Sequence, residues 1–169
     1  EQSHIEAKNS GKIEYYNIRT VQHEDDGEIH KIVVTRNGTV SIFDSNEKEL
    51  EQHKVEIGAT IYPENGEQVE KGDVLVEWDP HHEPILTEYE GIAEYIDIEE
   101  GVTMREEIDE DTGLTAKVII DYSGKKNLQA RIDIKDDSGE TISKYPMPTG
   151  AHISVNNGQR VFAGDTLAR

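Results

Sequence analysis

The sequence predicts an all-β fold made of two related modules, and three observations support this prediction. Apolar residues alternate with polar ones at a period of two in many short runs, such as Val40 and Ile42, which is typical of half-buried strands. Turn-forming pairs such as Asn37-Gly38 lie between these runs. One motif occurs twice. Many short strands separated by turns indicate a sandwich or a barrel.

Other segments add strands to this prediction. Alternation also marks Ile32 with Val34, Ile92 with Ile96 and Ile98, Ala116 with Val118 and Ile120, and Ile132 with Ile134. In residues 13–18 the alternation changes phase, which predicts a β-bulge. Residues 46–55 carry polar side chains on every helical face, so we expect a charged hairpin or an edge strand there rather than a helix.

The charge of the chain argues against nucleic-acid binding. Its 169 residues include 36 acidic and 17 basic ones, which gives a net charge of −19. A phosphate backbone would be repelled unless a basic patch were present. The densest basic stretch, Lys125-Lys126 with Arg131, is soon followed by Asp133. A basic protein partner would suit this charge.

The chain contains no cysteine, which excludes disulfides and cysteine-ligated zinc and fits a reducing compartment. Its first residues lack a basic region followed by an apolar run, and no segment approaches the roughly 18 apolar residues that a membrane-spanning helix needs. We therefore expect a soluble protein without a membrane partner.

The repeated motif is the clearest internal signal. Residues 58–77 read GATIYPENGEQVEKGDVLVE and residues 150–169 read GAHISVNNGQRVFAGDTLAR, with nine identities in twenty ungapped positions. The positions that we take as fold-defining are Gly58, Asn65, Gly66, Val69, Gly72, Asp73 and Leu75 in the first copy, and Gly150, Asn157, Gly158, Val161, Gly164, Asp165 and Leu167 in the second.

Each of these residues has an expected structural role. The Asn-Gly pairs predict hairpin turns, the Gly-Asp pairs predict second, tighter turns, and the valines and leucines are expected to point inward. The repeat thus describes a fold rather than a site. It predicts two modules, residues 1–80 and 81–169, with a boundary near Asp79-Pro80, where a proline follows the end of a strand.

A search for chemical sites finds little. The acidic residues between Glu99 and Asp111 are typical of a solvated face. A calcium-loop spacing from Glu107 fails because its twelfth position is Val118, where a bidentate Glu is needed. Nucleophile and phosphate-loop motifs are absent from the sequence.

One stretch offers candidate metal ligands: Asp79, His81, His82 and Glu83. Adjacent histidines in a strand point to opposite sides and do not easily share one ion, so a polar loop between the modules is the favoured interpretation. We predict no catalytic, metal-binding or cofactor-binding residue in this chain.

The repeat is similar to the half-motif of barrel-sandwich hybrid domains, which include biotinyl and lipoyl carriers. Those carriers present a modifiable lysine at a hairpin tip, commonly in a Met-Lys-Met or Asp-Lys-Ala setting. Here Met104 is followed by Arg105, and neither Met104 nor Met147 has a lysine neighbour. A biotinyl/lipoyl-type carrier is therefore the disfavoured alternative.

Residues outside the repeat give a closer resemblance. Together with the repeat, the chain contains Trp78-Asp79-Pro80, then Pro84-Ile85-Leu86-Thr87-Glu88 with Gly91, then Asp109-Glu110 with Thr112-Gly113-Leu114. This order resembles the large lineage-specific insertion in the trigger loop of the bacterial RNA polymerase β′ subunit, and the resemblance covers essentially the whole chain. Residues 128–132 and 145–148 depart from the family pattern. Both segments precede the second repeat copy, so these departures affect what is expected of the local backbone there.

The resemblance implies two tandem sandwich-barrel hybrid domains in a fragment of a nucleotidyltransferase that lacks the catalytic residues. Such an insertion joins the two arms of a loop that folds over incoming nucleotide, and it is associated with nucleotide addition, pausing and transcript cleavage. The implied partners are the remaining polymerase subunits (β, β′, α and ω) and regulators near the secondary channel, in the cytoplasm. The magnesium and zinc of the parent enzyme belong to its other parts, so no cofactor is expected in this fragment.

Overall fold

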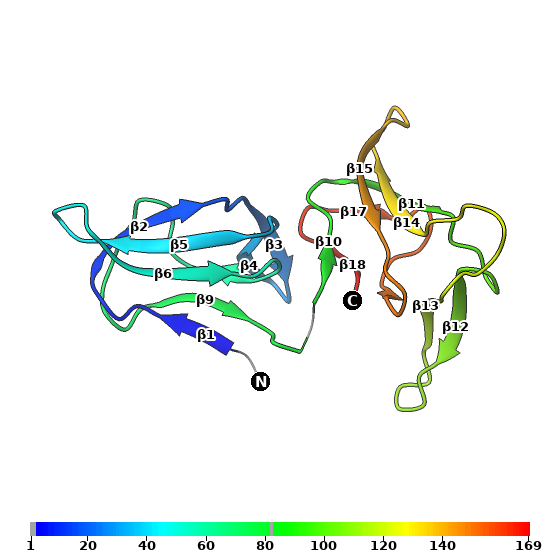
Figure 1. Cartoon of the computed structure of the whole chain (residues 1–169), viewed down its shortest axis with the longest axis horizontal. Helices are drawn as coiled ribbons and strands as arrows, with labels where there is room; N and C mark the ends of the chain where they lie inside the picture. The colour runs from blue at the N-terminus through cyan, green and yellow to red at the C-terminus, as the bar shows by residue number, and fades with distance from the viewer. Residues whose placement is uncertain (1–2, 82) are drawn as a thin grey trace. The chain divides into compact units, whose positions relative to one another are not determined.

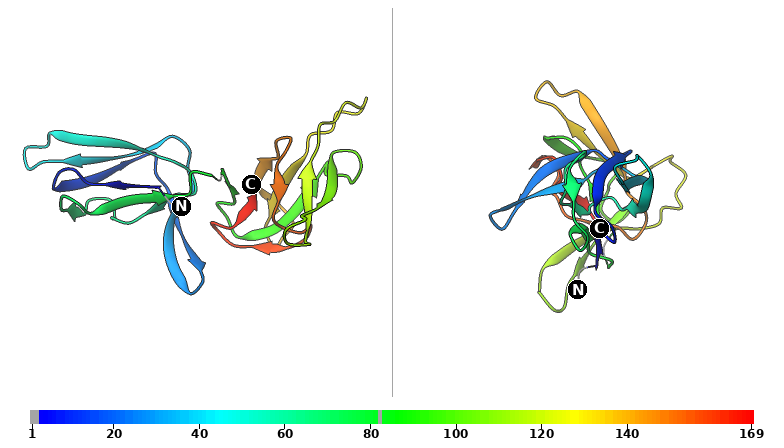
Figure 2. Two further views of the ribbon diagram at one scale, coloured as in Figure 1. Left: turned by 90° about the horizontal axis from the view of Figure 1, so that it is seen from below. Right: turned by 90° about the vertical axis from the view of Figure 1, so that its left-hand side faces the viewer.

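The computed structural model describes residues 3–81 and 83–169, and this part of the chain consists of strands, turns and connecting segments without a helix (Figure 1, Figure 2). The all-β prediction is confirmed. The chain divides into two compact units, Glu1–Glu83 (unit 1) and Pro84–Arg169 (unit 2). No helix capable of crossing a membrane occurs in the residues described.

The strands of both units are short. Unit 1 contains β1 (Ser3–Glu6), β2 (Gly11–Tyr16), β3 (Thr20–Asp25), β4 (Glu28–Val33), β5 (Gly38–Phe43), β6 (Glu49–Val55), β7 (Thr60–Ile61), β8 (Gln68–Val69) and β9 (Val74–Trp78). Unit 2 contains β10 (Ile85–Leu86), β11 (Gly91–Ile96), β12 (Met104–Ile108), β13 (Thr115–Ile119), β14 (Arg131–Lys135), β15 (Thr141–Pro146), β16 (His152–Ile153), β17 (Arg160–Val161) and β18 (Thr166–Ala168).

The two units share one topology. In unit 1 a five-stranded sheet has the order β1-β9-β7-β4-β3 and a four-stranded sheet has the order β6-β5-β2-β8. In unit 2 the corresponding orders are β10-β18-β16-β13-β12 and β15-β14-β11-β17. Each strand of unit 2 therefore occupies the place of the strand of the same rank in unit 1. That each unit is a sandwich-barrel hybrid stays a prediction.

Each unit has its own apolar core, to which both of its sheets contribute. In unit 1 the fully buried side chains include Ile13 of β2, Ile42 of β5 and Leu75 of β9. In unit 2 they include Ile132 of β14 and Leu167 of β18. Burying one such side chain contributes about 1.5–3 kcal/mol. As far as the chain is described, the two cores share no residue, so each unit has its own source of stability.

Three glycine-containing turns recur in each unit. In unit 1 they are closed by hydrogen bonds from Ala59 N to Glu56 O, from Glu67 N to Glu64 O and from Asp73 N to Glu70 O, at 3.2, 3.1 and 3.0 Å. Their third residues, Gly58, Gly66 and Gly72, have φ values of 89°, 89° and 96°. Gly150, Gly158 and Gly164 repeat this in unit 2, with φ values of 92°, 87° and 90°. A positive φ at the third residue is the pattern of a type II turn.

The prediction that the Asn-Gly pairs form hairpin turns is wrong. The strands on either side of Asn65-Gly66, β7 and β8, belong to different sheets, and so do β16 and β17 around Asn157-Gly158. Neither asparagine is among the residues with positive φ, whereas a type I′ hairpin needs positive φ at both central residues. The Asn-Gly turn thus moves the chain from one sheet to the other.

Gly11 and Gly91 allow strands to approach closely, a requirement that the sequence alone does not reveal. A Cβ atom added at Gly91 would lie 2.4 Å from the carbonyl oxygen of Lys135 and 2.7 Å from Cγ2 of Ile134. At Gly11 it would lie 2.4 Å from the carbonyl oxygen of Phe43. Because backbone atoms cannot yield as a flexible side chain can, both positions require glycine.

These glycines begin a second repeated motif. Residues 11–18 read GKIEYYNI and residues 91–98 read GIAEYIDI. In each segment the strand, β2 or β11, is followed by a residue in the left-handed conformation, Asn17 or Asp97, at φ 54°. The motif is hard to find in the sequence because the connection between β13 and β14 is longer than that between β4 and β5. This changes the spacing to the later repeat.

The β-bulge predicted in residues 13–18 is wrong. Strand β2 pairs with β5 in one continuous register. The strand ends at Tyr16, and the left-handed Asn17 then reverses the alternation. Ile18 consequently packs against the same core as Ile13 and Tyr15.

The alternating series are only partly matched by the cores. Val33 in β4, Ala93 and Tyr95 in β11 and Ile119 in β13 lie in or against the cores, whereas Ile32 and Ile92 do not. Val34 and Val118 of the predicted series are buried, at 2% and 6% exposure. These strands carry apolar residues on both faces, so alternation alone cannot choose the inward face. The edge strand expected in residues 46–55 is confirmed, because β6 lies at the edge of its sheet.

Replacing Gly91 by alanine should destabilise unit 2 by about 2–4 kcal/mol, because the methyl group would overlap the Lys135 carbonyl in the β11–β14 pair. Gly139→Ala is the matched control. Gly139 has φ 86° but open space around a Cβ, so only the left-handed strain of about 1–2 kcal/mol is expected.

Urea unfolding monitored by far-UV circular dichroism measures these changes, while the fluorescence of Trp78 reports on unit 1 alone. Trp78 is the one tryptophan of the chain and packs against the unit 1 core. The fluorescence transition of Gly91→Ala should match that of wild type. An equal shift in both signals would show that the two units do not unfold separately.

Candidate interaction surface

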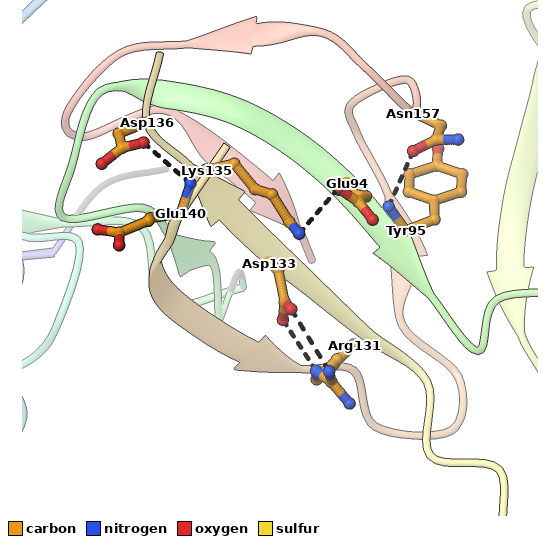
Figure 3. A network of polar contacts seen from close by, with 8 residues as sticks. All are labelled: Glu94, Tyr95, Arg131, Asp133, Lys135, Asp136, Glu140 and Asn157. Carbon is orange, nitrogen blue, oxygen red and sulfur yellow. Dashed lines mark hydrogen bonds and ion pairs between the residues drawn. The ribbon is translucent and has the colours of Figure 1, made fainter. Parts of the chain in front are cut away.

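The repeated asparagines join turns to strands. Oδ1 of Asn157 accepts a hydrogen bond from the backbone N of Tyr95 at 2.9 Å (Figure 3), and Oδ1 of Asn65 accepts one from the backbone N of Tyr15 at 3.0 Å. A short side chain with an acceptor oxygen at this position therefore pairs with the neighbouring strand, independently of the φ that the turn requires.

A lysine covers each of these two tyrosines. Nζ of Lys31 lies 5.9 Å from the ring centroid of Tyr15, and Nζ of Lys117 lies 5.4 Å from that of Tyr95, which is cation–π geometry. Burial raises the pKa of Tyr15, although its hydrogen bond with Lys31 acts in the opposite direction. The hydroxyl stays protonated at neutral pH and donates to the carbonyl of Pro63.

The remaining repeat residues close turns or fill the cores. The carboxylates of Asp73 and Asp165 accept hydrogen bonds from the backbone N of Glu70 and of Phe162 at 2.9 and 2.8 Å. The inward residues Val69, Leu75, Val161 and Leu167 are 0–3% exposed. The structure thus places the repeat residues in the turns and cores of both units, and it does not gather them into a site.

The family-motif residues at the junction between the units are also structural. Trp78 packs against the unit 1 core. Oδ1 of Asp79 accepts a hydrogen bond from the backbone N of His81 at 2.9 Å, which forms a turn around Pro80. Pro84 is the first residue of unit 2, and the backbone N of Glu88 donates to the hydroxyl of Tyr145 at 2.8 Å.

Metal ligation is not supported in the part of the chain that is described, where no three His, Asp or Glu residues are grouped to hold an ion. His82 lies outside the described residues. The carboxylate of Asp109 accepts hydrogen bonds from the backbone N of Asp111 and Thr112, at 2.9 and 3.4 Å. The calcium-like stretch is therefore a turn closed by its own aspartate.

A carrier function gains no support either. Met104 and Met147, the two methionines of the chain, are each 6% exposed and belong to the unit 2 core. Neither marks an exposed hairpin tip where a lysine would be modified.

Unit 1 contains a buried carboxylate network at its edge strand β6. The side chain of Glu51 is 7% exposed and accepts hydrogen bonds from Nε2 of His53 at 2.7 Å, Nδ2 of Asn9 at 2.9 Å and the backbone N of Lys8 at 3.0 Å. Burial alone raises the pKa of Glu51, but these hydrogen bonds outweigh burial and lower it below its usual value.

Unit 2 contains a different buried carboxylate, Asp133 on β14. Nε of Arg131 donates to Oδ1 of Asp133 at 2.8 Å (Figure 3), and this hydrogen bond raises the pKa of Arg131. In unit 1 the equivalent residue is Ser41, which faces Glu14 as Asp133 faces Glu94. Within the described residues the Ser41 hydroxyl has no hydrogen-bond partner. This position therefore carries a different polar residue in each unit and does not form a repeated functional site.

Three aliphatic side chains project into solvent from equivalent hairpins of the two units. Ile29 in the β3–β4 hairpin is 68% exposed, and Ile108 and Leu114 in the β12–β13 hairpin are 74% and 69% exposed. Each hairpin extends away from the rest of its own unit (Figure 1, Figure 2). These are the most exposed large apolar side chains in the described part of the chain.

We call residues 108–114 the tip surface. The backbone N of Asp109 donates to the carbonyl of Leu114 at 2.8 Å, and Gly113 N donates to the carbonyl of Asp109 at 2.7 Å. Gly113 has φ 71°. Asp109 and Gly113 of the family motif therefore build the turn, whereas Glu110 and Leu114 are exposed. The sequence predicts a solvated acidic face for the stretch that contains Ile108. An apolar residue within such a face was the sequence feature that could have indicated this surface.

Comparison with known proteins identifies the subunit. The chain is 41% identical over 169 residues to the DNA-directed RNA polymerase subunit β′ of Methylacidiphilum infernorum, 40% over 169 residues to that of Koribacter versatilis, and 39% over 176 residues to that of Syntrophobacter fumaroxidans. The chain is homologous to one segment of the β′ subunit. The alignments cover 99–100% of this chain but 12–13% of each relative.

The expected resemblance is thus confirmed at the level of the subunit. No family model matches the β′-like segment. Because the segment spans only a small share of its relatives, the activity and partners of a whole polymerase do not follow from the homology alone.

Unit 1 of the β′-like segment should lose stability in acid through Glu51. Its folded-state pKa lies below the ordinary value of 4.5, so its contribution is complete above that value and is lost as pH falls through the folded-state pKa. Glu51→Gln should cost on the order of 1 kcal/mol at neutral pH and should flatten the pH dependence below about 4.5. Urea midpoints from Trp78 fluorescence at several pH values test this.

Glu110→Gln, which neutralises an exposed carboxylate in unit 2, is the control and should keep the wild-type profile. Parallel pH profiles for wild type and Glu51→Gln would show that Glu51 is not the responsible group.

Proposed function

We propose that the segment is a non-catalytic regulatory insertion of RNA polymerase that modulates trigger-loop movement during DNA-templated transcription. The observation that carries this proposal is the homology to β′ over the whole chain. The structure supports a non-catalytic role because the repeat residues and the buried carboxylates serve packing and turns. The chemistry of nucleotide transfer, with its magnesium, would belong to other parts of the parent enzyme, as would its zinc.

The physical basis is a difference in contact energy. A domain that contacts the enzyme body differently in two loop states shifts their equilibrium by the difference in binding free energy between those states. A difference of about 3 kcal/mol changes the ratio of the states about a hundredfold. The segment needs no active site for such an effect, only a stable scaffold and a surface that reaches a partner.

The proposed partners are the β, β′, α and ω subunits and regulators near the secondary channel, in the cytoplasm. The net charge of −19 favours basic protein surfaces and disfavours direct contact with nucleic acid.

Deleting the segment from the parent polymerase should change pause lifetimes or transcript cleavage while leaving basal nucleotide addition intact. The deletion removes contacts that bias the loop, and it leaves the groups that carry out the reaction in place. Single-round transcription on a pause-containing template measures both quantities. Wild-type pausing and cleavage in the deletion enzyme would refute the proposed function.

Expression of the chain together with a biotin or lipoate ligase should leave its intact mass unchanged, because the sequence contains neither a Met-Lys pair nor an Asp-Lys-Ala segment. Mass spectrometry of the purified chain is the measurement. The gain of one cofactor mass would instead establish the carrier alternative.

A further inference from the structure

We propose that the tip surface, residues 108–114 of the β12–β13 hairpin, docks onto a basic protein surface with an apolar hollow on the polymerase that carries this segment. This inference rests on the proposed function, because it names the contact through which the segment would bias the enzyme.

The first argument is exposure without structural need. Ile108 and Leu114 are 74% and 69% exposed, and neither belongs to the unit 2 core. Strand β12 lies at the edge of its sheet, so the hairpin is open along that side. Apolar side chains held in water at the end of a projecting element are stabilised when a partner covers them.

The second argument is that the tip is already ordered. Besides the two backbone hydrogen bonds between Asp109 and its neighbours, the backbone N of Leu114 donates to Oγ1 of Thr112 at 3.2 Å. The carboxylate of Asp109 fixes the intervening residues. A preformed tip loses little conformational entropy on binding.

The third argument is charge. The hairpin carries Glu106, Glu107, Asp109, Glu110 and Asp111. The hairpin has two cations: Arg105 is paired with Glu107, with Nη2 of Arg105 2.6 Å from Oε1, and Lys117, opposite Glu106, lies with its Nζ over the Tyr95 ring. The carboxylates outnumber these cations, so the aliphatic side chains lie in a region of net negative charge. Complementarity requires lysine or arginine around the hollow that receives them, and this charge repels a phosphate backbone.

The choice of occupant follows from the homology. A segment that is part of a larger subunit meets the surfaces of its own enzyme at a high effective concentration, whereas a separate protein must be recruited from solution. A basic surface of the same polymerase is therefore favoured over a diffusible regulator.

The β3–β4 hairpin provides a matched control within the chain. It occupies the equivalent place in unit 1 and exposes Ile29. Its tip is a short turn at Asp25–Glu28, with φ values of 50° and 80° at Asp26 and Gly27, and it offers one exposed aliphatic residue where the tip surface offers two.

Photo-crosslinking in the assembled polymerase tests the contact. A benzoylphenylalanine residue at position 114 should crosslink to a polymerase peptide that combines lysine or arginine with apolar residues. The yield should be about tenfold higher than at position 138, a hairpin turn of the same unit, and should fall with added salt. Crosslinks to nucleic acid, crosslinks only to an added regulator, or equal yields at both positions would overturn the proposal.

Transcription assays separate this inference from the proposed function. The double variant Ile108→Ser/Leu114→Ser should shift pause lifetime in the same direction as deletion of the segment, while Ile29→Ser should not. If deletion changes pausing but the double variant behaves as wild type, the docking inference fails and the proposed function stands. If deletion itself has no effect, the proposed function fails. Urea unfolding of the variant chain should match wild type, which excludes a folding defect as the cause.

Discussion

Each unit depends on moving the chain between two sheets within a few residues, and a glycine in the left-handed conformation makes this possible at three turns. These glycines also use their backbone N–H groups. Gly58, Gly66 and Gly72 donate to the carbonyls of Val33, Ile13 and Ala7 at 2.8 Å each, and Gly150, Gly158 and Gly164 donate to Ile119, Ala93 and Thr87 at 2.7–2.8 Å. A turn that satisfied its own geometry but not this hydrogen bond would leave a strand carbonyl unpaired.

The duplication within the chain separates what the fold requires from what it permits. The turn glycines, the Asn–Tyr–Lys contacts and the close approach at Gly11 and Gly91 occur in both units, so they belong to the shared fold. The buried polar positions differ. The backbone N of Lys8 in unit 1 donates to a carboxylate, and that of Glu88 in unit 2 donates to a tyrosine hydroxyl. Charged groups at these positions therefore satisfy local backbone hydrogen bonds and do not indicate a catalytic site.

The sequence predicted the fold class and the repeat well, because turn glycines and inward valines and leucines leave a direct pattern. It failed where one pattern suits two structures. Asn-Gly serves a type I′ hairpin and a type II turn equally, and only the sheet membership of β7 and β8 decides between them. In β11 the neighbouring apolar residues Ile92 and Ala93 lie on opposite faces, and the structure is needed to show that Ala93 belongs to the core. The candidate surface was hidden because exposure is a three-dimensional property. In the sequence, Ile108 cannot be distinguished from an apolar strand residue that packs into a core. The structure is needed to show that no other element of the described chain covers its side of the hairpin.

Stability and interaction occupy different residues in this chain. The side chains that fill the cores are almost fully buried, whereas those of the tip surface contact solvent and contribute little to either core. A substitution at the tip thus alters what the segment contacts without weakening the scaffold that presents it, since exposed positions away from caps and ion pairs change stability by about 0.5 kcal/mol or less. For a segment that would act through its position, this separation has a direct consequence. The strength of its contact can vary over a wide range while the two β-units that hold it remain folded.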